Sequence, residues 1–437
     1  MNQLAEKRFT LPKSDLIEQI RETRNRTLAL VEDLRDDQLD VPSMEIVNPF
    51  RWELGHVAFF YDAFVCQTLD GHPPLMDGGN DFFNSFEVDH DDRWGLGLPD
   101  REGIMGYMSD VYEKSIERLD SHDPSAQETY LYQLAVLHED MHAEAFTYMR
   151  QTLAYPKPVH AYSEVSPAGD LKGDVEIPGG TCLIGARQED AFVFDNEKWA
   201  HPAEVAPFKI ARAPVTNSQY AEFVEDEGYL SEGLWSTQGW IWRMKLGAES
   251  PIYWSRGKDT WLRRHFDTYV DLEPNHPVSH VTWYEAEAYC RWANRRLPTE
   301  AEWNVAASED STGGGNFEAR CYPWGDRVND GSLANLDSAS MGCVDVAAFP
   351  DGDSAFGCRQ MLGNVWEWTA DPFYPLPGFE IDFPYKEYSA PWFGYRKVLK
   401  GGAWATRTRL ATNKYRNFFQ PYRNDVIAGF RTCSNEV

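Results

Sequence analysis

The sequence predicts an α+β protein of two domains, a bundle of helices followed by a domain of short strands and turns. The 437 residues are enough for two or three domains, and 42% hydrophobic with 14% aromatic residues allow large packed cores. The first 155 residues or so carry apolar side chains at helical spacing. From about residue 172 onward, strand-like runs, glycine turns and tryptophans replace that pattern.

Four amphipathic segments predict an antiparallel four-helix bundle. In the first, Leu16, Ile17 and Ile20 begin an apolar series after Ser14, which we expect to cap the helix. Pro49 suits the first turn of the second helix. The segments are DLIEQIRETRNRTLALVEDL, FRWELGHVAFFYDAFVCQTL, REGIMGYMSDVYEKSIERL and AQETYLYQLAVLHEDMHAEAFTYMRQTL.

A linker with three prolines, AYPKPVHAYSEVSPAGDLKGD, separates the two halves, so we expect domains over 1–160 and 170–437. In the second domain, Thr216 and Thr282 are expected to cap two inserted helices, TNSQYAEFVEDEG and TWYEAEAYCRWANRR. Trp366 and Trp368 of GNVWEW are expected in its core. No repeat of fixed period is present, which argues against a solenoid or propeller.

The charge balance excludes several classes of partner. There are 69 acidic and 41 basic residues, a net charge of −28, so we expect neither a nucleic-acid nor a membrane partner. No apolar stretch reaches the roughly 18 residues of a membrane span, and the N-terminal segment lacks the apolar core of a signal peptide; we expect a cytoplasmic protein. The seven cysteines never form a C-x-x-C pair, so a disulfide framework or cysteine zinc cluster is not expected.

The segment HEDMH predicts a metal site. His138 and His142 lie four residues apart, on one face of the fourth helix, where two imidazoles reach one ion. The segment also satisfies the H-E-x-x-H pattern of zinc peptidases. However, the residues after His142 lack the further histidine of that class, and Glu164 falls in the linker.

His56, in the second helix, is the best third ligand if the second and fourth helices face each other. Three imidazoles would leave up to three positions open on an octahedral iron. Glu139 and Asp140 point away from the ligand face and are expected to orient the ligand histidines as hydrogen-bond acceptors. The alternative is histidines packed in the bundle without a metal.

These motifs together resemble the EgtB-type nonheme iron sulfoxide synthases of ergothioneine biosynthesis, over nearly the whole chain. The resemblance implies a DinB-like four-helix bundle with His56, His138 and His142 as Fe(II) ligands, followed by a C-type-lectin-like domain of the formylglycine-generating-enzyme type. The second half contributes APVTNSQYAEFV, HPVSHVTWYEAEAYCRWANRRLPTEAEW, YPWGD, GNVWEWTAD, VLKGGAWAT and RNFFQPYRNDVIAGFR. Formylglycine formation itself is not expected, because GGAWATRTRLATNKYRNFF lacks the copper-binding cysteines.

The resemblance implies an O₂-dependent reaction that joins a thiol sulfur to the imidazole C2 of hercynine, Nα-trimethylhistidine, and oxidises it to a sulfoxide. By the same resemblance Arg93 takes a substrate carboxylate, Asn417 holds hercynine and Arg423 lies near the thiol. Phe418 offers a ring for cation–π contact with the trimethylammonium group. For each arginine an ordinary ion pair is the competing interpretation.

Three departures from the family pattern bear on the substrate and the proton donor. Met141 replaces a glutamine of some members, and Phe418 with Phe419 replaces the Trp-Asp of γ-glutamylcysteine-using members, which favours cysteine as the thiol. A tyrosine pair of some cysteine-using members is replaced by phenylalanines in NDFFNSFEVDHDDRW. The remaining candidates for the proton donor are Tyr374, Tyr385 and Tyr388.

Several alternatives stay open at this point. The nearest is a selenoneine synthase that joins hercynine to a selenosugar on the same scaffold. Ovothiol-type relatives are less expected, because the chain ends soon after AGFRTCS. A zinc peptidase and a metal-free binding protein built on the same two domains represent other classes.

Overall fold

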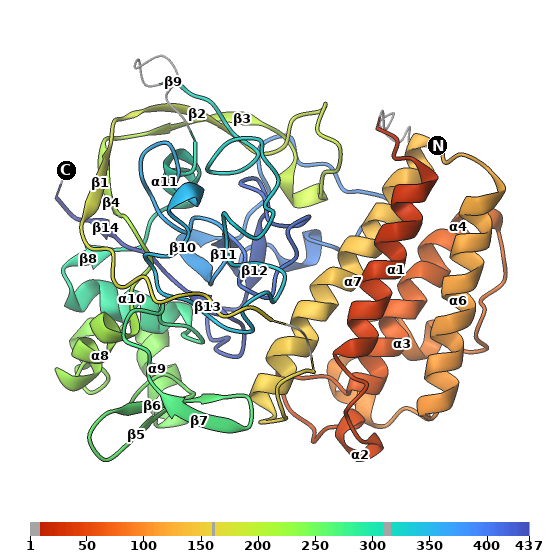
Figure 1. Cartoon of the computed structure of the whole chain (residues 1–437), viewed down its shortest axis with the longest axis horizontal. Helices are drawn as coiled ribbons and strands as arrows, with labels where there is room; N and C mark the ends of the chain where they lie inside the picture. Colours follow the sequence, from red (N-terminus) through yellow and green to blue (C-terminus); the bar gives the residue numbers. More distant parts are fainter. Residues whose placement is uncertain (1–8, 160–161, 309–315, 437) are drawn as a thin grey trace. The chain divides into compact units, whose positions relative to one another are not determined.

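The computed structural model describes residues 9–159, 162–308 and 316–436, and these form two compact units (Figure 1). Unit 1 consists of Met1–His160, Glu189–Phe192 and Asp382–Glu387. Unit 2 consists of Ala161–Gln188, Val193–Ile381 and Tyr388–Val437. The two short segments of unit 1 lie far along the chain, and the expectation of a contiguous first domain did not include them.

Unit 1 is the predicted helical bundle. Four long helices, α1, α3, α6 and α7, lie side by side, with α1 against α7 and α3 against both α6 and α7 (Figure 1). A π-helical turn, η1, extends α3. The elements are α1 Lys13–Ala29, α2 Asp36–Leu39, α3 Phe50–Tyr61, η1 Asp62–Gln67, α4 Thr68–Asp70, α5 Gly79–Phe83, η2 His90–Trp94, α6 Arg101–Ser121 and α7 Ala126–Thr152.

Local signals explain where the bundle helices begin. Ser125 caps α7, accepting the N–H of Glu128 at 3.3 Å, while the Glu128 carboxylate accepts the N–H of Ser125 at 2.7 Å. The prediction for Ser14 is wrong, because Pro12 already adopts the non-helical N-cap conformation (φ −55°, ψ 141°) and α1 begins at Lys13. The Ser14 hydroxyl instead donates to the carboxylate of Asp15 at 2.9 Å.

Helix α3 is buried on nearly every side; within its bounds every residue except Arg51 is buried. Its apolar sequence fits that position, and the ring of Phe50 stacks on that of Phe146 from α7 at 5.6 Å. A polar side chain on such a helix needs a partner inside the protein. This requirement applies to Glu53 and His56, which both lie on α3.

The two distant segments of unit 1 attach to Tyr130 of α7. The Tyr130 hydroxyl donates to the carboxylate of Asp382 at 3.0 Å, and its ring stacks on Phe192 at 5.2 Å. Both contacts are among buried or half-buried side chains. The bundle therefore holds these segments by side-chain contacts, which short-range sequence patterns do not report.

Unit 2 contains the strand-rich part of the chain, and together with unit 1 it confirms the α+β class. Within the described residues the sheets have the orders β1-β4-β14-β8, β12-β11-β10-β13, β3-β2-β9 and β5-β6-β7. Most neighbouring strands pair antiparallel; β10 with β13 and β2 with β9 pair parallel. The strands are β1 Asp174–Ile177, β2 Gly180–Ile184, β3 His201–Val205, β4 Phe208–Ala211, β5 Trp254–Arg256, β6 Trp261–His265, β7 Thr268–Asp271, β8 Arg295–Arg296, β9 Asn316–Phe317, β10 Trp366–Pro372, β11 Lys397–Lys400, β12 Asn417–Phe419, β13 Ala428–Gly429 and β14 Cys433–Ser434.

Helices and short turns lie between these strands along the chain. Thr216 caps α8 and Thr282 caps α10 through capping boxes, as predicted. The elements are α8 Asn217–Glu225, α9 Thr237–Leu246, α10 Trp283–Trp292, α11 Glu300–Ala306, η3 Asp195–Glu197, η4 Glu232–Leu234, η5 Pro350–Gly352 and η6 Ala390–Trp392.

Trp366 and Trp368 are buried in unit 2, which confirms their assignment to the core. A buried ion pair also lies there, between Arg431 and Glu367 at 2.6 Å. Across the three described ranges, no helix is both long enough and apolar enough to cross a membrane.

Candidate metal centre

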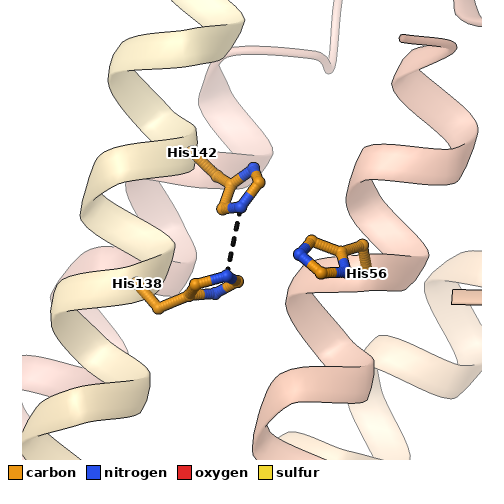
Figure 2. Close-up of side chains that lie close together, drawn as sticks. All are labelled: His56, His138 and His142. Atoms are coloured by element: carbon orange, nitrogen blue, oxygen red, sulfur yellow. Dashed lines mark hydrogen bonds between the residues drawn. The ribbon is translucent and has the colours of Figure 1, made fainter. Parts of the chain in front are cut away.

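Three histidines of unit 1 converge between α3 and α7 (Figure 2). His56 projects from α3 towards His138 and His142 of α7, and one candidate ligand atom of each lies within 4.8 Å of the others. The Nε2 atoms of His138 and His142 are 3.2 Å apart, and the His56 ring centroid is 5.0 Å from each of theirs. The three side chains that the sequence indicated as ligands therefore form one cluster.

Each histidine ring is held in a different way. The Nδ1–H of His56 donates to the carbonyl of Phe83 at 2.7 Å, which leaves the Nε2 lone pair free. The Nδ1 of His142 lies 2.5 Å from the Oε2 of Glu53. The ring of His138 stacks on Phe60, with 3.8 Å between ring centroids. Hydrogen bonds thus orient two of the rings, and packing orients the third.

The donor set fits a divalent transition metal. Burial, together with the neighbouring His142, lowers the pKa of His56 to about 3 and the pKa of His138 well below its usual range. At neutral pH these two imidazoles are uncharged, which is the form that binds a metal. Histidine nitrogens lie about 2.1 Å from such ions, so adjacent ligand nitrogens are about 3 Å apart. The 3.2 Å between His138 and His142 matches that spacing.

Glu53 is a member of the site that the sequence reasoning missed. It is buried, and the Nδ2–H of Asn48 donates to its Oε1 at 2.5 Å. Burial raises the pKa of this carboxyl, but the charge and hydrogen bond of His142 outweigh that effect and bring the pKa to about 2. The available signal was a lone carboxylate in the apolar segment FRWELGHVAFFY, three residues before His56 and on the same helix face.

The prediction that Glu139 and Asp140 support the ligand histidines is wrong. Glu139 pairs with Arg24 of α1 at 3.4 Å, and Asp140 accepts a hydrogen bond from the hydroxyl of Thr23 at 2.8 Å. Successive helical residues turn by about 100°, so both side chains face α1 rather than the ligand face of α7. A peptidase needs Glu139 at the metal, and Glu164 is exposed in unit 2. These contacts disfavour a zinc peptidase.

A cavity of about 280 Å³ opens beside His56, entirely within unit 1. Tyr385 of the segment Asp382–Glu387 forms part of its wall, with its ring centroid 5.0 Å from that of Phe60 and 6.0 Å from that of His138. The remaining wall combines aromatic and polar side chains: Phe59, Ala63, Phe64, Gln67, Asn80, Asn84, Ser85, Phe86, Glu87, Pro384, Lys386 and Glu387. One of the predicted ligands, His56, therefore lines a cavity of mixed aromatic and polar character.

The other two predicted tyrosines belong to unit 2. The Tyr374 side chain is 54% exposed. The Tyr388 ring stacks on Phe194, with 5.0 Å between centroids. Tyr385, in contrast, belongs to unit 1 and lines the cavity beside His56.

Arg93 is linked to the histidine cluster through Asn48 and Trp52. Its Nη1 donates to the Oδ1 of Asn48 at 2.8 Å, and its Nη2 donates to the carbonyl of Val88 at 3.3 Å. The guanidinium carbon also lies 3.8 Å from the centroid of the Trp52 ring, which stacks on His56 at 4.8 Å. The structure therefore already provides this guanidinium with protein partners.

The remaining predicted substrate residues lie in unit 2. The side-chain oxygen of Asn417, in β12, accepts a hydrogen bond of 2.8 Å from the backbone N–H of Phe418. The ring of Phe418 is buried and stacks on Phe373 at 4.1 Å. Arg423 donates two hydrogen bonds, of 2.5 and 2.6 Å, to the buried carboxylate of Asp425. Phe418 and Arg423 thus have structural partners within their own unit.

Comparison with known proteins agrees with this architecture. Residues 19–146 match the model of the DinB superfamily, and residues 160–436 match that of the sulfatase-modifying factor enzyme 1-like domain. The hercynine oxygenase of Mycolicibacterium thermoresistibile is 34% identical over 430 residues, 96% of this chain and 94% of the relative. The hercynine oxygenase of Mycolicibacterium smegmatis is 32% identical over 434 residues, 96% and 99% of the two chains.

A formylglycine-generating enzyme of Streptomyces coelicolor is 30% identical over 317 residues, covering 65% of this chain and 96% of that enzyme. That relative corresponds to part of the chain, whereas the hercynine oxygenases match nearly all of it. With relatives of this name 32–34% identical over 96% of its length, and with matches of its own to both domain models, this chain belongs to the hercynine oxygenase family.

Proposed function

We propose that this protein is an Fe(II)- and O₂-dependent sulfoxide synthase that joins the imidazole C2 of hercynine to the sulfur of cysteine in ergothioneine biosynthesis. Family membership over 96% of the chain supports the reaction. The observation that carries the proposal is the cluster of His56, His138 and His142 on α3 and α7. The same three residues are the proposed iron ligands.

The reaction balances with the two substrates and O₂ alone. The C2–H and S–H bonds break and a C–S bond forms, which releases two electrons; oxidation of the sulfur to the sulfoxide releases two more. One oxygen atom becomes the sulfoxide oxygen, and the other leaves as water with the two released protons. When bound, iron supplies the centre that activates O₂ and brings the imidazole and the thiolate together.

The residues of unit 1 would hold the metal and supply a proton. His56 and His138 are neutral because burial disfavours their charged forms, and so they are ready to bind a cation. The cavity beside His56 is the proposed route for substrate. Tyr385, on the wall of that cavity, is the proposed proton donor, ahead of Tyr374 and Tyr388.

The proposed substrate contacts rest on the family resemblance. Arg93 would take a carboxylate, Asn417 and Phe418 would contact hercynine, and Arg423 would lie near the thiol. Phe418 and Phe419 leave no carboxylate where γ-glutamylcysteine-using members have one. That difference supports cysteine as the thiol.

Anaerobic loading with Fe(II), followed by hercynine, cysteine and O₂, tests the proposal. Mass spectrometry should detect the sulfoxide that joins the two substrates; γ-glutamylcysteine and a selenosugar serve as comparison donors and should give less product. His56→Ala should lose iron and O₂ consumption. His72→Ala is a matched control, because this histidine contacts the carbonyl of its neighbour Pro73 and lies outside the cluster and the cavity.

Two results would contradict the proposal. One is failure of every donor to yield a C–S or C–Se product with the iron-loaded protein. The other is stoichiometric zinc together with peptide hydrolysis that persists without O₂, which would restore the peptidase interpretation.

A further inference from the structure

A chain of hydrogen bonds leads away from His142 on the side opposite the other two histidines. The Nδ1 of His142 lies 2.5 Å from Oε2 of Glu53, and Oε1 of Glu53 accepts from Asn48 at 2.5 Å. The Oδ1 of Asn48 then accepts from Arg93 at 2.8 Å. Both carboxylate oxygens of Glu53 are therefore engaged, and its side chain is only 4% exposed.

This hydrogen bond selects one tautomer of His142. The carboxylate oxygen of Glu53 is the acceptor, so Nδ1 of His142 is the donor and carries the hydrogen. The lone pair then lies on Nε2, the atom 3.2 Å from Nε2 of His138. In this tautomer the ring presents a lone pair, and not a hydrogen, to the centre of the cluster. A carboxylate partner also makes the imidazole a stronger donor to a metal.

Helix α3 contributes two side chains to the site. Glu53 and His56 are three residues apart, which places both on the face that meets α7. His56 reaches the cluster directly, whereas Glu53 reaches the far side of His142. Among the three histidines, His56 is held by a backbone carbonyl and His138 by ring packing, so His142 is the one whose orientation depends on an ionisable side chain.

Arg93 contacts two of the residues that support the histidines, Asn48 and Trp52. Through Asn48 it holds Glu53, and through its contact with the Trp52 ring it supports the stack on His56. Removal of Asn48 or Arg93 leaves the hydrogen bond between Glu53 and His142 in place but loosens the carboxylate. Their effect on the metal should therefore be smaller than that of Glu53.

We propose that Glu53 is a positioning residue for the metal, which sets the tautomer and orientation of His142, and that Asn48 and Arg93 hold Glu53 in place. The inference rests on the metal-binding role of the histidines in the proposed function. It gives Arg93 a task at the metal that is separate from contact with a substrate carboxylate.

Anaerobic titration of the whole chain with Co(II), followed by the absorption of the bound ion, tests the inference without turnover. Glu53→Gln should weaken Co(II) binding about 10- to 100-fold. Glu139→Gln is the matched control, because it removes another buried carboxylate of unit 1 that pairs with Arg24 and contacts none of the ligand rings. Its Co(II) affinity should equal that of the wild type.

Asn48→Leu and Arg93→Leu should each weaken Co(II) binding about fivefold, the worth of one hydrogen bond. If Arg93 contacts only substrate, Arg93→Leu leaves the Co(II) affinity unchanged, and the Arg93 part of the inference is overturned. Glu53→Asp keeps the charge with a shorter reach and should fall between wild type and Glu53→Gln. If Glu53→Gln does not fold, as judged by circular dichroism, Glu53→Asp replaces it as the test.

The ¹⁵N NMR signals of His142 in the Zn(II)-loaded protein report the tautomer directly. The wild type should show a protonated Nδ1 with a strong hydrogen bond, and Glu53→Gln should weaken that signature. Equal Co(II) affinity of wild type and Glu53→Gln overturns the inference even if the enzyme makes its product. A wild type that binds no Co(II) overturns the inference and the metal role together, whereas metal binding that depends on Glu53 without sulfoxide formation overturns only the proposed reaction.

Discussion

Tyr385 lies with its ring centroid 6.0 Å from that of His138 and lines the cavity beside His56. We expect Tyr385→Phe to bind iron as the wild type does, because the phenol is not part of the histidine cluster. Sulfoxide formation should fall about 100-fold or more, the usual contribution of a positioned general acid. Rates of product formation at saturating substrate measure the effect.

Tyr374→Phe and Tyr388→Phe are the controls for this experiment, because neither residue lines the cavity. Both should retain nearly full rates. A Tyr385→Phe enzyme as fast as these controls would remove Tyr385 from the mechanism.

The three histidines could be predicted at the residue scale, but the carboxylate of Glu53 that contacts His142 could not. His138 and His142 share a helix face by their spacing alone, and His56 followed from the expectation that the second and fourth helices face each other. Glu53 and His142 are 89 positions apart, and only the packing of α3 on α7 brings them together. Glu139 fits the zinc-peptidase pattern in the sequence, but in the structure it pairs with Arg24 of α1.

The close approach of α3 and α5 depends on one glycine. A Cβ on Gly55 would lie 2.2 Å from the buried ring of Phe83, whose carbonyl accepts the Nδ1–H of His56. Gly55→Ala should therefore displace Phe83 and lower the free energy of unfolding by about 1 to 3 kcal/mol, the usual cost of overpacking. Because the His56 acceptor moves with Phe83, Co(II) affinity should fall too.

Gly106→Ala is the control at the same scale. Gly106 lies inside α6, is exposed, and has no atom within 4 Å of the position that a Cβ would occupy. Alanine there should raise the free energy of unfolding by up to about 1 kcal/mol and leave the metal alone. Urea denaturation and Co(II) titration of both variants provide the comparison; equal behaviour would contradict the role of the Gly55 contact.

At the scale of elements, the helices with periodic apolar residues could be predicted. The short segments that join unit 1 only through tertiary contacts could not. The four bundle helices and the caps at Thr216 and Thr282 follow from local patterns that the structure reproduces. The segments Glu189–Phe192 and Asp382–Glu387 carry no periodic signal, and contacts with α7 such as those of Tyr130 bring them into unit 1.

A buried carboxyl in unit 2 makes the stability of the whole protein depend on pH. Burial raises the pKa of Glu285 to about 7, although the Thr282 N–H and the Tyr229 hydroxyl both donate to its carboxylate. Between pH 4.5 and 7 the unfolded chain releases this proton first, so folding stability falls as pH rises through that range. The loss attributable to Glu285 is on the order of 3 kcal/mol and is complete above pH 7.

Glu285→Gln removes this titration and keeps a neutral side chain of the same shape. The free energy of unfolding of the variant minus that of the wild type should therefore increase from pH 5 to pH 8. Urea denaturation across that range measures the difference, in which all other titrating groups cancel. A constant difference would show that Glu285 is ionised in the folded protein throughout.

The composition of unit 1 from three separate stretches of chain affects how this enzyme can be recombined with its relatives. A hybrid with residues 1–160 from one parent and the rest from another would take its histidines from the first parent. It would take Tyr385, with Pro384, Lys386 and Glu387 of the cavity wall, from the second. The proposed metal ligands and the proposed proton donor would thus be inherited separately, and a transplant of the whole site must carry the segment Asp382–Glu387 with the bundle.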